Sequence, residues 1–241
     1  VLDKELAAGA EAVQLLYGIS NPDESIRTKA MEMGQSSFNG LRPKGRSRLG
    51  LSSGIFGNGF CLPRATLQKV PYKAHSIVED IEYHTKLLQA GIRTYFCDKA
   101  SVLAKMPTSP EAAEKQRVRW ERGRAITINT FAPQLWKEAL KGNAMALDAL
   151  VDIITPPATY IGIPLLVTII LGGTAWKIAA LVCIVIMVAH YFISSLKYGN
   201  AKNLMSILAF TPGYVAWKIV LLGKSFLTQK RLGWERTDRE E

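Results

Sequence analysis

The feature that most constrains the fold of this 241-residue chain is a sparsely charged segment from Ile153 to Leu222. Within it, residues 153–171 contain no charged side chain, and residues 175–196 contain only Lys177. A helix needs about 20 predominantly apolar residues to cross a bilayer. We therefore expect two transmembrane spans, joined by a tight turn at Gly172-Gly173-Thr174.

A third apolar stretch, residues 204–222, is broken by Pro212-Gly213 and contains Lys218. Two alternatives stay open for it, a third span or a segment along the membrane interface. The positive-inside bias favours two crossings, because the residues before Ile153 and the tail 229–241 then both face the cytoplasm.

The part of the chain before residue 153 has the pattern of a globular domain with alternating strands and helices. Its apolar periodicity and turn residues predict a strand at 12–17, a helix from 21 to 38 with its N-cap at Asn21, a helix at 77–90, and strands at 93–96 and 102–104 joined by a turn at Asp98-Lys99. This order favours an α/β layer fold.

A further helix is predicted to begin at Pro110, capped by Thr108 or Ser109. Beyond Gly123 the apolar pattern predicts an amphipathic helix on the membrane surface, which Pro133 should bend or restart. We accordingly divide the chain into an α/β domain (1–125), an interfacial helix (126–145), a membrane region (146–228) and a cytoplasmic tail (229–241).

The chain is basic, with a formal net charge of +10 and a pI of about 9.6, which suits anionic lipids, a nucleotide substrate or nucleic acid. No basic run interleaved with aromatic residues supports nucleic acid. Residues 42–48 contain Pro43 and Gly45 and predict a basic loop, either merely solvated or facing phosphates. The cysteines lack the spacing of a zinc site or the even count of a disulfide framework.

Two short motifs in the predicted helices combine groups that suit a nucleotide sugar. Glu79 and Asp80 fall in the first turn of one helix, where backbone N–H groups favour a carboxylate. Gln116, Arg119 and Trp120 stand at positions i, i+3 and i+4 of the next helix and so share a face. A guanidinium binds phosphate oxygens through two parallel hydrogen bonds, and an indole offers a flat apolar surface. Taken alone, each motif is also compatible with an ordinary solvated helix face.

Four glycines lie between residues 50 and 59, and among them Gly57-Asn58-Gly59 precedes Phe60-Cys61. Glycine permits positive φ and lets the backbone approach a ligand closely, although glycine-rich segments are also simple turns.

In this order the motifs resemble those of the membrane-bound family 2 glycosyltransferases, the group that contains cellulose, chitin and hyaluronan synthases. Gly57-Asn58-Gly59 resembles the acceptor-side loop of that family, and Trp234-Glu235-Arg236-Thr237 resembles the tail of some members. The family's aspartate-x-aspartate motif is absent from this sequence. Since that motif precedes these elements in the family, we interpret the chain as the C-terminal part of a longer enzyme, inactive alone.

The resemblance implies an α/β fold, namely the later half of a GT-A-like nucleotide-sugar transferase domain, followed by a helical transmembrane region. It implies inverting transfer from a nucleotide diphosphate sugar, expected to be a UDP-sugar, to a carbohydrate or lipid acceptor during polysaccharide or glycolipid synthesis. Asp80 would be the base, and Glu79 would orient neighbouring groups or bind the acceptor. Gln116, Arg119 and Trp120 would bind donor and acceptor.

Mg²⁺ or Mn²⁺ is expected with the full enzyme, its ligands lying outside this chain. The expected location is the inner membrane of a bacterium, with the catalytic part in the cytoplasm. The alternative is a membrane scaffold that keeps the fold without catalysis.

Overall fold

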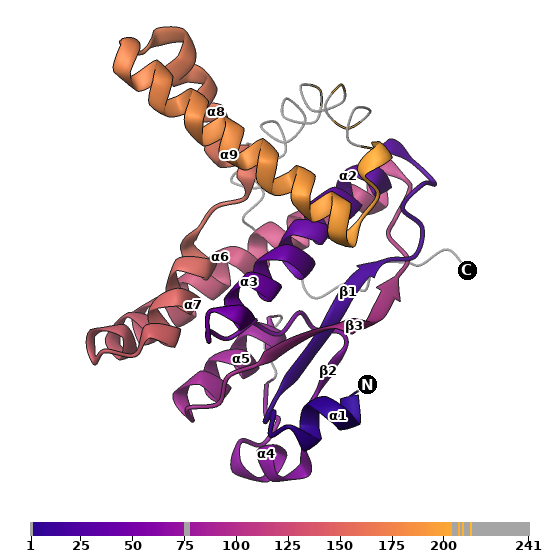
Figure 1. Ribbon diagram of the computed structural model, residues 1–241, viewed down its shortest axis with the longest axis vertical. Coiled ribbons are helices and arrows are strands. Elements are labelled where there is room, and N and C mark those ends of the chain that lie inside the picture. Colours follow the sequence, from indigo (N-terminus) through magenta and orange to yellow (C-terminus); the bar gives the residue numbers. More distant parts are fainter. Residues whose placement is uncertain (1, 75–77, 204–206, 208, 210–212, 214–241) are drawn as a thin grey trace.

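The computed structural model describes residues 2–74, 78–203, 207, 209 and 213 (Figure 1). The helices are α1 (Leu2–Ala7), α2 (Ile26–Gln35), the π-helix η1 (Ser36–Leu41), α3 (Arg42–Arg48), α4 (Arg64–Lys69), α5 (Glu79–Gln89), α6 (Pro110–Leu140), α7 (Ala144–Ile154), α8 (Ala158–Leu171), α9 (Thr174–Tyr198) and the short 3₁₀ helix η2 (Ala201–Asn203). The strands are β1 (Val13–Ile19), β2 (Phe60–Cys61) and β3 (Tyr95–Ala104).

The three strands form one mixed sheet in the order β2-β1-β3, in which β1 runs parallel to β3 and antiparallel to β2. The strands expected at 93–96 and 102–104 are in fact the single strand β3. Its pairing with β1 jumps from Leu15 opposite Cys97 to Leu16 opposite Ser101. The predicted turn residues therefore sit in a bulge, which places extra residues in one strand without ending the pairing.

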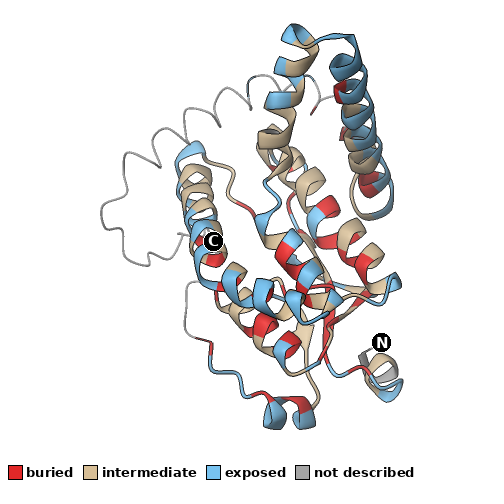
Figure 2. Ribbon diagram, turned by 90° about the vertical axis from the view of Figure 1, so that its left-hand side faces the viewer, coloured by how far each residue is buried: buried red, intermediate tan, exposed pale blue. Residues whose placement is uncertain are grey.

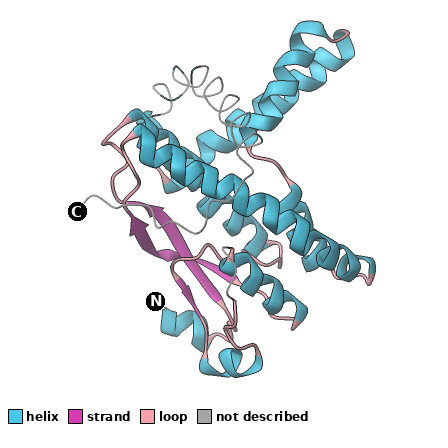
Figure 3. Cartoon of the chain, turned by 180° about the vertical axis from the view of Figure 1, so that it is seen from behind, coloured by secondary structure: helices cyan, strands magenta, loops and turns pink. Residues whose placement is uncertain are grey.

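Two clusters of the core lie on the side of the sheet that carries α5, α6 and α7 (Figures 1 and 3), and a third consists of Ala10, Val13, Leu15 and Cys97, packed with Leu6 of α1. Helix α5 sits in the middle of this layer because it is apolar on two faces. Tyr83 and Leu87 pack with Ala12 of the sheet region, whereas Leu88 packs with Phe131 and other residues of α6 and α7. Figure 2 shows the buried residues gathered along these inner faces. The α/β expectation for this part is confirmed.

Helix α6 is continuous from Pro110 to Leu140, so the separate helix expected at 126–145 is wrong. Pro133 lies inside α6 and does not restart it. Phe131 and Leu135 are buried against α5 and α7, which explains the amphipathic pattern by helix packing. Ser109 caps the helix as predicted, accepting a hydrogen bond from the Ala112 backbone N–H.

Helix α2 begins later than expected, because Ser25 rather than Asn21 is its N-cap. The Ser25 and Thr28 side chains each accept a hydrogen bond from the other's backbone N–H, which is a capping box. Asn21 is instead buried, and its amide bonds both the backbone N–H and the backbone carbonyl of Met106.

The expected loop at 42–48 is also wrong, since these residues form α3. Pro43 stands in the first turn, where its missing N–H costs no helical hydrogen bond. Arg46 donates to Asp148 at 2.7 Å and to Asp152 at 3.0 Å, and Arg42 pairs with Asp152 as well. These ion pairs with α7 stabilise a helix that its own sequence would not predict.

The first expected span, 153–171, is divided by Thr155-Pro156-Pro157 between the end of α7 and the start of α8. Helix α8 has 14 residues, about 21 Å at 1.5 Å per residue, against about 30 Å of bilayer hydrocarbon. Within the described part of the chain, α9 is the one helix long and apolar enough to cross a membrane. Gly172 and Gly173 form the turn between α8 and α9, and Thr174, which was expected in the turn, is the first residue of α9.

The α8–α9 hairpin projects from the domain (Figures 1 and 2). The C-terminal end of α9 packs on η1. The His190 ring and the Ser37 hydroxyl lie 2.7 Å apart, and a Cβ on Gly40 would come within 2.7 Å of the Tyr198 ring. The Tyr198 hydroxyl also donates to Asp98 at 2.9 Å. Apart from residues 207, 209 and 213, the apolar stretch at 204–222 lies outside the described residues, as does the tail at 229–241.

Candidate active site

Glu79 and Asp80 occupy the first turn of α5, as predicted. The Asp80 carboxylate accepts a hydrogen bond from the Ile81 backbone N–H at 2.8 Å. Burial nevertheless raises the pKa of Asp80 to about 6, and the neighbouring Glu79 carboxylate adds to the rise. A carboxylate with a pKa near the working pH can accept a proton from a substrate hydroxyl and release it again.

The glycine loop lies directly beside Asp80. A Cβ built on Gly57 would stand 3.6 Å from Asp80 Oδ2, so these two predicted site residues are brought together. Gly57 has φ +77° and Gly59 has φ +70°, and a Cβ on Gly59 would come within 2.9 Å of Val102. Gly57 and Asn58 are exposed, so this rim of the site is open to a ligand.

Arg119 and Trp120 lie on α6, one helical turn before the point where α6 touches the start of α5. That contact is close, because a Cβ on Gly123 would lie 3.0 Å from Val78. Both side chains are exposed, and the Arg117 guanidinium stands 5.3 Å from the centre of the Trp120 ring. The arrangement places a cation and an aromatic ring near the N-terminus of α5.

Gln116 lies on α6 about two helical turns before the contact at Gly123. Its Nε2 contacts the Met106 sulfur at 4.0 Å, and Gln35 of α2 contacts the same sulfur at 4.0 Å. Gln35 was not predicted to lie near Gln116. No local sequence pattern indicates this contact, because only the packing of α2 brings Gln35 to Met106.

Sequence reasoning also missed Tyr72 and Gln14. Tyr72 is 44% exposed and stacks on Phe60. Partial burial raises the pKa of its phenol, and the Glu79 and Asp80 carboxylates add smaller effects in the same direction. Gln14 is wholly buried and bonds the glycine loop. A glutamine inside the apolar strand pattern at 12–17 was the available signal for Gln14.

The α6 segment that carries Trp120 is tied to the base of the α8–α9 hairpin. The Tyr160 hydroxyl donates to Glu121 at 3.2 Å, and Arg124 donates to the Thr155 carbonyl at 2.5 Å. The same segment of α6 therefore carries part of the candidate site and contacts the base of the apolar hairpin.

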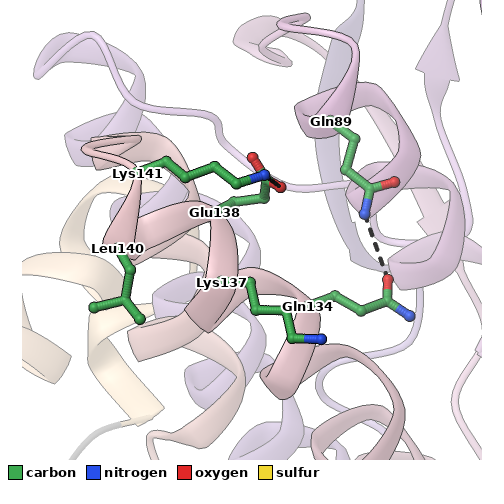
Figure 4. Close-up of a pocket in the computed structure, with 6 residues that line it drawn as sticks. All are labelled: Gln89, Gln134, Lys137, Glu138, Leu140 and Lys141. Carbon is green, nitrogen blue, oxygen red and sulfur yellow. Dashed lines mark hydrogen bonds and ion pairs between the residues drawn. The ribbon is translucent and has the colours of Figure 1, made fainter.

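A hollow of about 430 Å³ lies between the ends of α5 and α6 (Figure 4), lined by Gln89, Gln134, Lys137, Glu138, Leu140 and Lys141. It is distant from Asp80, because Gln89 and Asp80 stand at opposite ends of α5. Gln89 donates to Gln134 at 3.4 Å across it. We do not place the active site there.

Among the described residues, no group of three or more histidine, cysteine, aspartate or glutamate side chains is arranged to hold a metal ion.

Comparison with known proteins gives one finding. A family model described as glycosyl transferase family group 2 matches residues 14–221, which include Asp80, the glycine loop, Arg119, Trp120 and the apolar hairpin. A search of curated proteins found no match.

Proposed function

The chain belongs to glycosyl transferase family group 2, which implies nucleotide-sugar transfer, and on this premise we propose that Asp80 is the base of an inverting transfer reaction. The observation that carries the proposal is the half-buried Asp80 carboxylate with its raised pKa, placed beside an exposed glycine loop. The resemblance to the cellulose, chitin and hyaluronan synthase group supports a carbohydrate or lipid acceptor.

In the proposed reaction, the acceptor hydroxyl loses its proton to Asp80 as its oxygen attacks the anomeric carbon of the donor. The bond from that carbon to the diphosphate oxygen breaks, and the electron pair leaves with the diphosphate. One displacement inverts the anomeric centre, so no side-chain nucleophile is required.

Arg119 and Trp120 suit the other demands of the reaction. Arg119 is exposed near the start of α5 and can donate two parallel hydrogen bonds to diphosphate oxygens. Trp120 and the missed Tyr72 present aromatic faces on which a sugar or a base can lie. We assign Glu79 and Asn58 to the acceptor side, since they adjoin Asp80 and Gly57.

We propose a UDP-sugar as the donor, with Mg²⁺ or Mn²⁺ accompanying its diphosphate. A divalent cation would neutralise charge on the leaving diphosphate. We assign no step of this mechanism to the cation.

We further propose that the α8–α9 hairpin is embedded in a bilayer, in the inner membrane of a bacterium with the α/β domain in the cytoplasm. The support is a large exposed apolar surface on both helices, which includes Leu166, Ile170, Leu171, Trp176, Ile178, Leu181, Val185 and Ile186. Soluble monomers rarely expose so much contiguous apolar area. This setting suits synthesis of a polysaccharide or glycolipid.

The test of the catalytic proposal is transfer by membranes that contain the full-length enzyme, assayed with a panel of nucleotide sugars. Asp80→Asn should leave donor binding nearly intact and lower turnover by about 10² to 10⁴. Glu138→Gln, an exposed change at the far end of α6, is the control.

The outcomes separate the alternatives. If Glu79→Gln abolishes turnover while Asp80→Asn retains it, the base is Glu79. If neither change matters in an active preparation, the proposed chemistry at this site is wrong. If no nucleotide sugar is used, the scaffold alternative is favoured.

A further inference from the structure

Gln14 of β1 is a wholly buried amide that bonds the glycine loop from below. Its Oε1 accepts a hydrogen bond from the Phe56 backbone N–H at 3.1 Å. Its Nε2 donates to the Asn58 carbonyl at 2.7 Å and to the Leu15 carbonyl at 2.9 Å. One side chain thus satisfies polar backbone groups on both sides of Gly57.

These bonds continue the sheet beyond the end of β2. Backbone pairing joins Gln14 to Phe60, and the Leu15 N–H donates to the Gly59 carbonyl at 2.8 Å. Before Gly59, the positive φ values of the loop turn its backbone out of the strand path, and the Gln14 amide makes the contacts that backbone would otherwise make.

From this geometry we propose that Gln14 is a positioning residue that holds Gly57 against Asp80. The loop then covers one side of the Asp80 carboxylate and keeps water from it. The catalytic part of this role rests on the function proposed above, whereas the grip on the loop does not.

Both length and chemistry require glutamine at this position. Methionine has a similar volume but would leave the Phe56 N–H and the Asn58 carbonyl without their partner. Glutamate would still accept from Phe56, yet its carboxylate would face the Asn58 carbonyl without a proton to share. Both variants should therefore release the loop, although they differ in charge.

Thr66 offers a matched control. It is 3% exposed, and its hydroxyl donates to the Glu11 carbonyl at 2.8 Å, next to the sheet but away from the loop. Thr66→Val removes one buried hydrogen bond at nearly constant volume. It therefore reports the effect of a general loss of stability.

Amide hydrogen exchange on the full chain tests the grip directly. In the wild type, the Phe56 amide should be protected. In Gln14→Met and Gln14→Glu, exchange at residues 56–59 should rise about tenfold or more over any rise in Thr66→Val. An unprotected Phe56 amide in the wild type, or an even rise across the whole protein, would overturn the proposal. The wild-type measurement decides even if a variant does not fold.

The catalytic consequence has its own readout. With the loop released, water reaches Asp80, so the acid limb of the pH–rate profile should move to lower pH and kcat should fall more than the donor KM rises. Thr66→Val should show neither change. If loop exchange is faster but the kinetics are unaltered, Gln14 holds the loop without a role in catalysis. If the wild type shows no transfer activity, only the proposed function is contradicted.

Discussion

At the scale of single residues, Asp80 is held where its charge is unfavourable to folding. Its carboxyl has a pKa of about 6 in the folded state, against an ordinary value of 3.8, because it is half-buried and lies beside Glu79. Between these two pH values, the folded state binds more protons than the unfolded state. The contribution of Asp80 to the free energy of unfolding therefore falls as pH rises from about 4 to 6 and stays low above that range.

Asp80→Asn should accordingly stabilise the protein, and under the proposed mechanism it should also lower turnover. At pH 8 the free energy of unfolding should increase by on the order of 1–3 kcal/mol, and at pH 4 the difference should be much smaller. Denaturant unfolding at the two pH values measures this. A variant that is equally destabilised at both would show that Asp80 is not a strained carboxylate.

His84 contributes to the free energy of unfolding with the opposite pH dependence. Burial lowers its pKa to about 4, with the Arg46 guanidinium adding to the effect, and its Nε2 lies 2.8 Å from the Ser52 hydroxyl. Below the ordinary pKa of 6.5 the unfolded state binds the proton first, so stability is lost as pH falls from 6.5 towards 4.

His84→Gln keeps a polar contact to Ser52 but has no group that titrates in this range. Between pH 7 and pH 4.5, we expect the free energy of unfolding of the wild type to fall by about 2 kcal/mol more than that of the variant. Unfolding curves of both proteins at these pH values test this. A gap that does not change with pH would contradict a buried neutral His84.

The residues of the candidate site were predictable to different degrees. The acidic pair and Gly57 follow from local signals, namely first-turn acids and a glycine cluster, and the structure brings them together. Gln14 follows only in part, because a glutamine in the apolar strand pattern at 12–17 indicates a buried polar group but does not identify the loop at 56–58 as its partner. Tyr72 and Gln35 likewise depend on contacts between distant segments.

At the scale of elements, α3 shows why local signals failed. Pro43 and Gly45 both disfavour a helix interior, and the cluster of cations predicts repulsion. Tertiary contacts outweigh these terms, because Arg42 and Arg46 meet Asp148 and Asp152 of α7. The anionic partners lie more than a hundred residues later, where no local pattern links them to α3.

Asp152→Asn should therefore destabilise the protein. It leaves Arg46, which is 8% exposed, with one carboxylate fewer, and we expect a loss of about 2 kcal/mol in the free energy of unfolding. The exposed pair of Lys141 and Glu138 provides a control, since Glu138→Gln should change stability by less than about 0.5 kcal/mol. Equal effects of the two changes would mean that the α3–α7 pairs do not stabilise α3.

The membrane segment shows the same limit of local reasoning in another form. Composition located the apolar residues correctly, but the chain breaks at Thr155-Pro156-Pro157. Residues 153 and 154 therefore belong to α7, which packs in the domain through Ala149 and Leu150. An apolar run records burial without telling whether protein or lipid surrounds it.

At the scale of the whole molecule, the α8–α9 hairpin is fastened to the α/β domain at both of its ends. Glu121 accepts a hydrogen bond from Tyr160 in the first turn of α8, and Arg124 donates to the Thr155 carbonyl just before α8. Ser37 and Asp98 contact His190 and Tyr198 in the C-terminal part of α9. Helix α8 spans about 21 Å and α9 about 38 Å, so nearly all of the chain between these contacts is helical. Insertion of the hairpin would therefore fix the height of Arg119 and Trp120 above the lipid.

Cys183 allows insertion to be tested, because it is exposed on α9 midway along the hairpin, whereas Cys97 is buried. With Cys61→Ser and Cys97→Ala, a polarity-sensitive fluorophore on Cys183 should shift its emission to the blue in vesicles of phosphatidylglycerol and phosphatidylcholine. It should also become protected from aqueous iodide, because hydrocarbon would surround the label.

A label on Leu103→Cys in a chain lacking Cys183 is the matched control. Leu103 is 57% exposed on β3, on the domain rather than the hairpin, so its label should remain open to iodide in the same vesicles. If both labels stay quenchable, the hairpin is not in the bilayer, and its apolar surface must be covered by protein instead. A concentration-dependent loss of quenching without lipid would then identify a second copy of the chain as the partner.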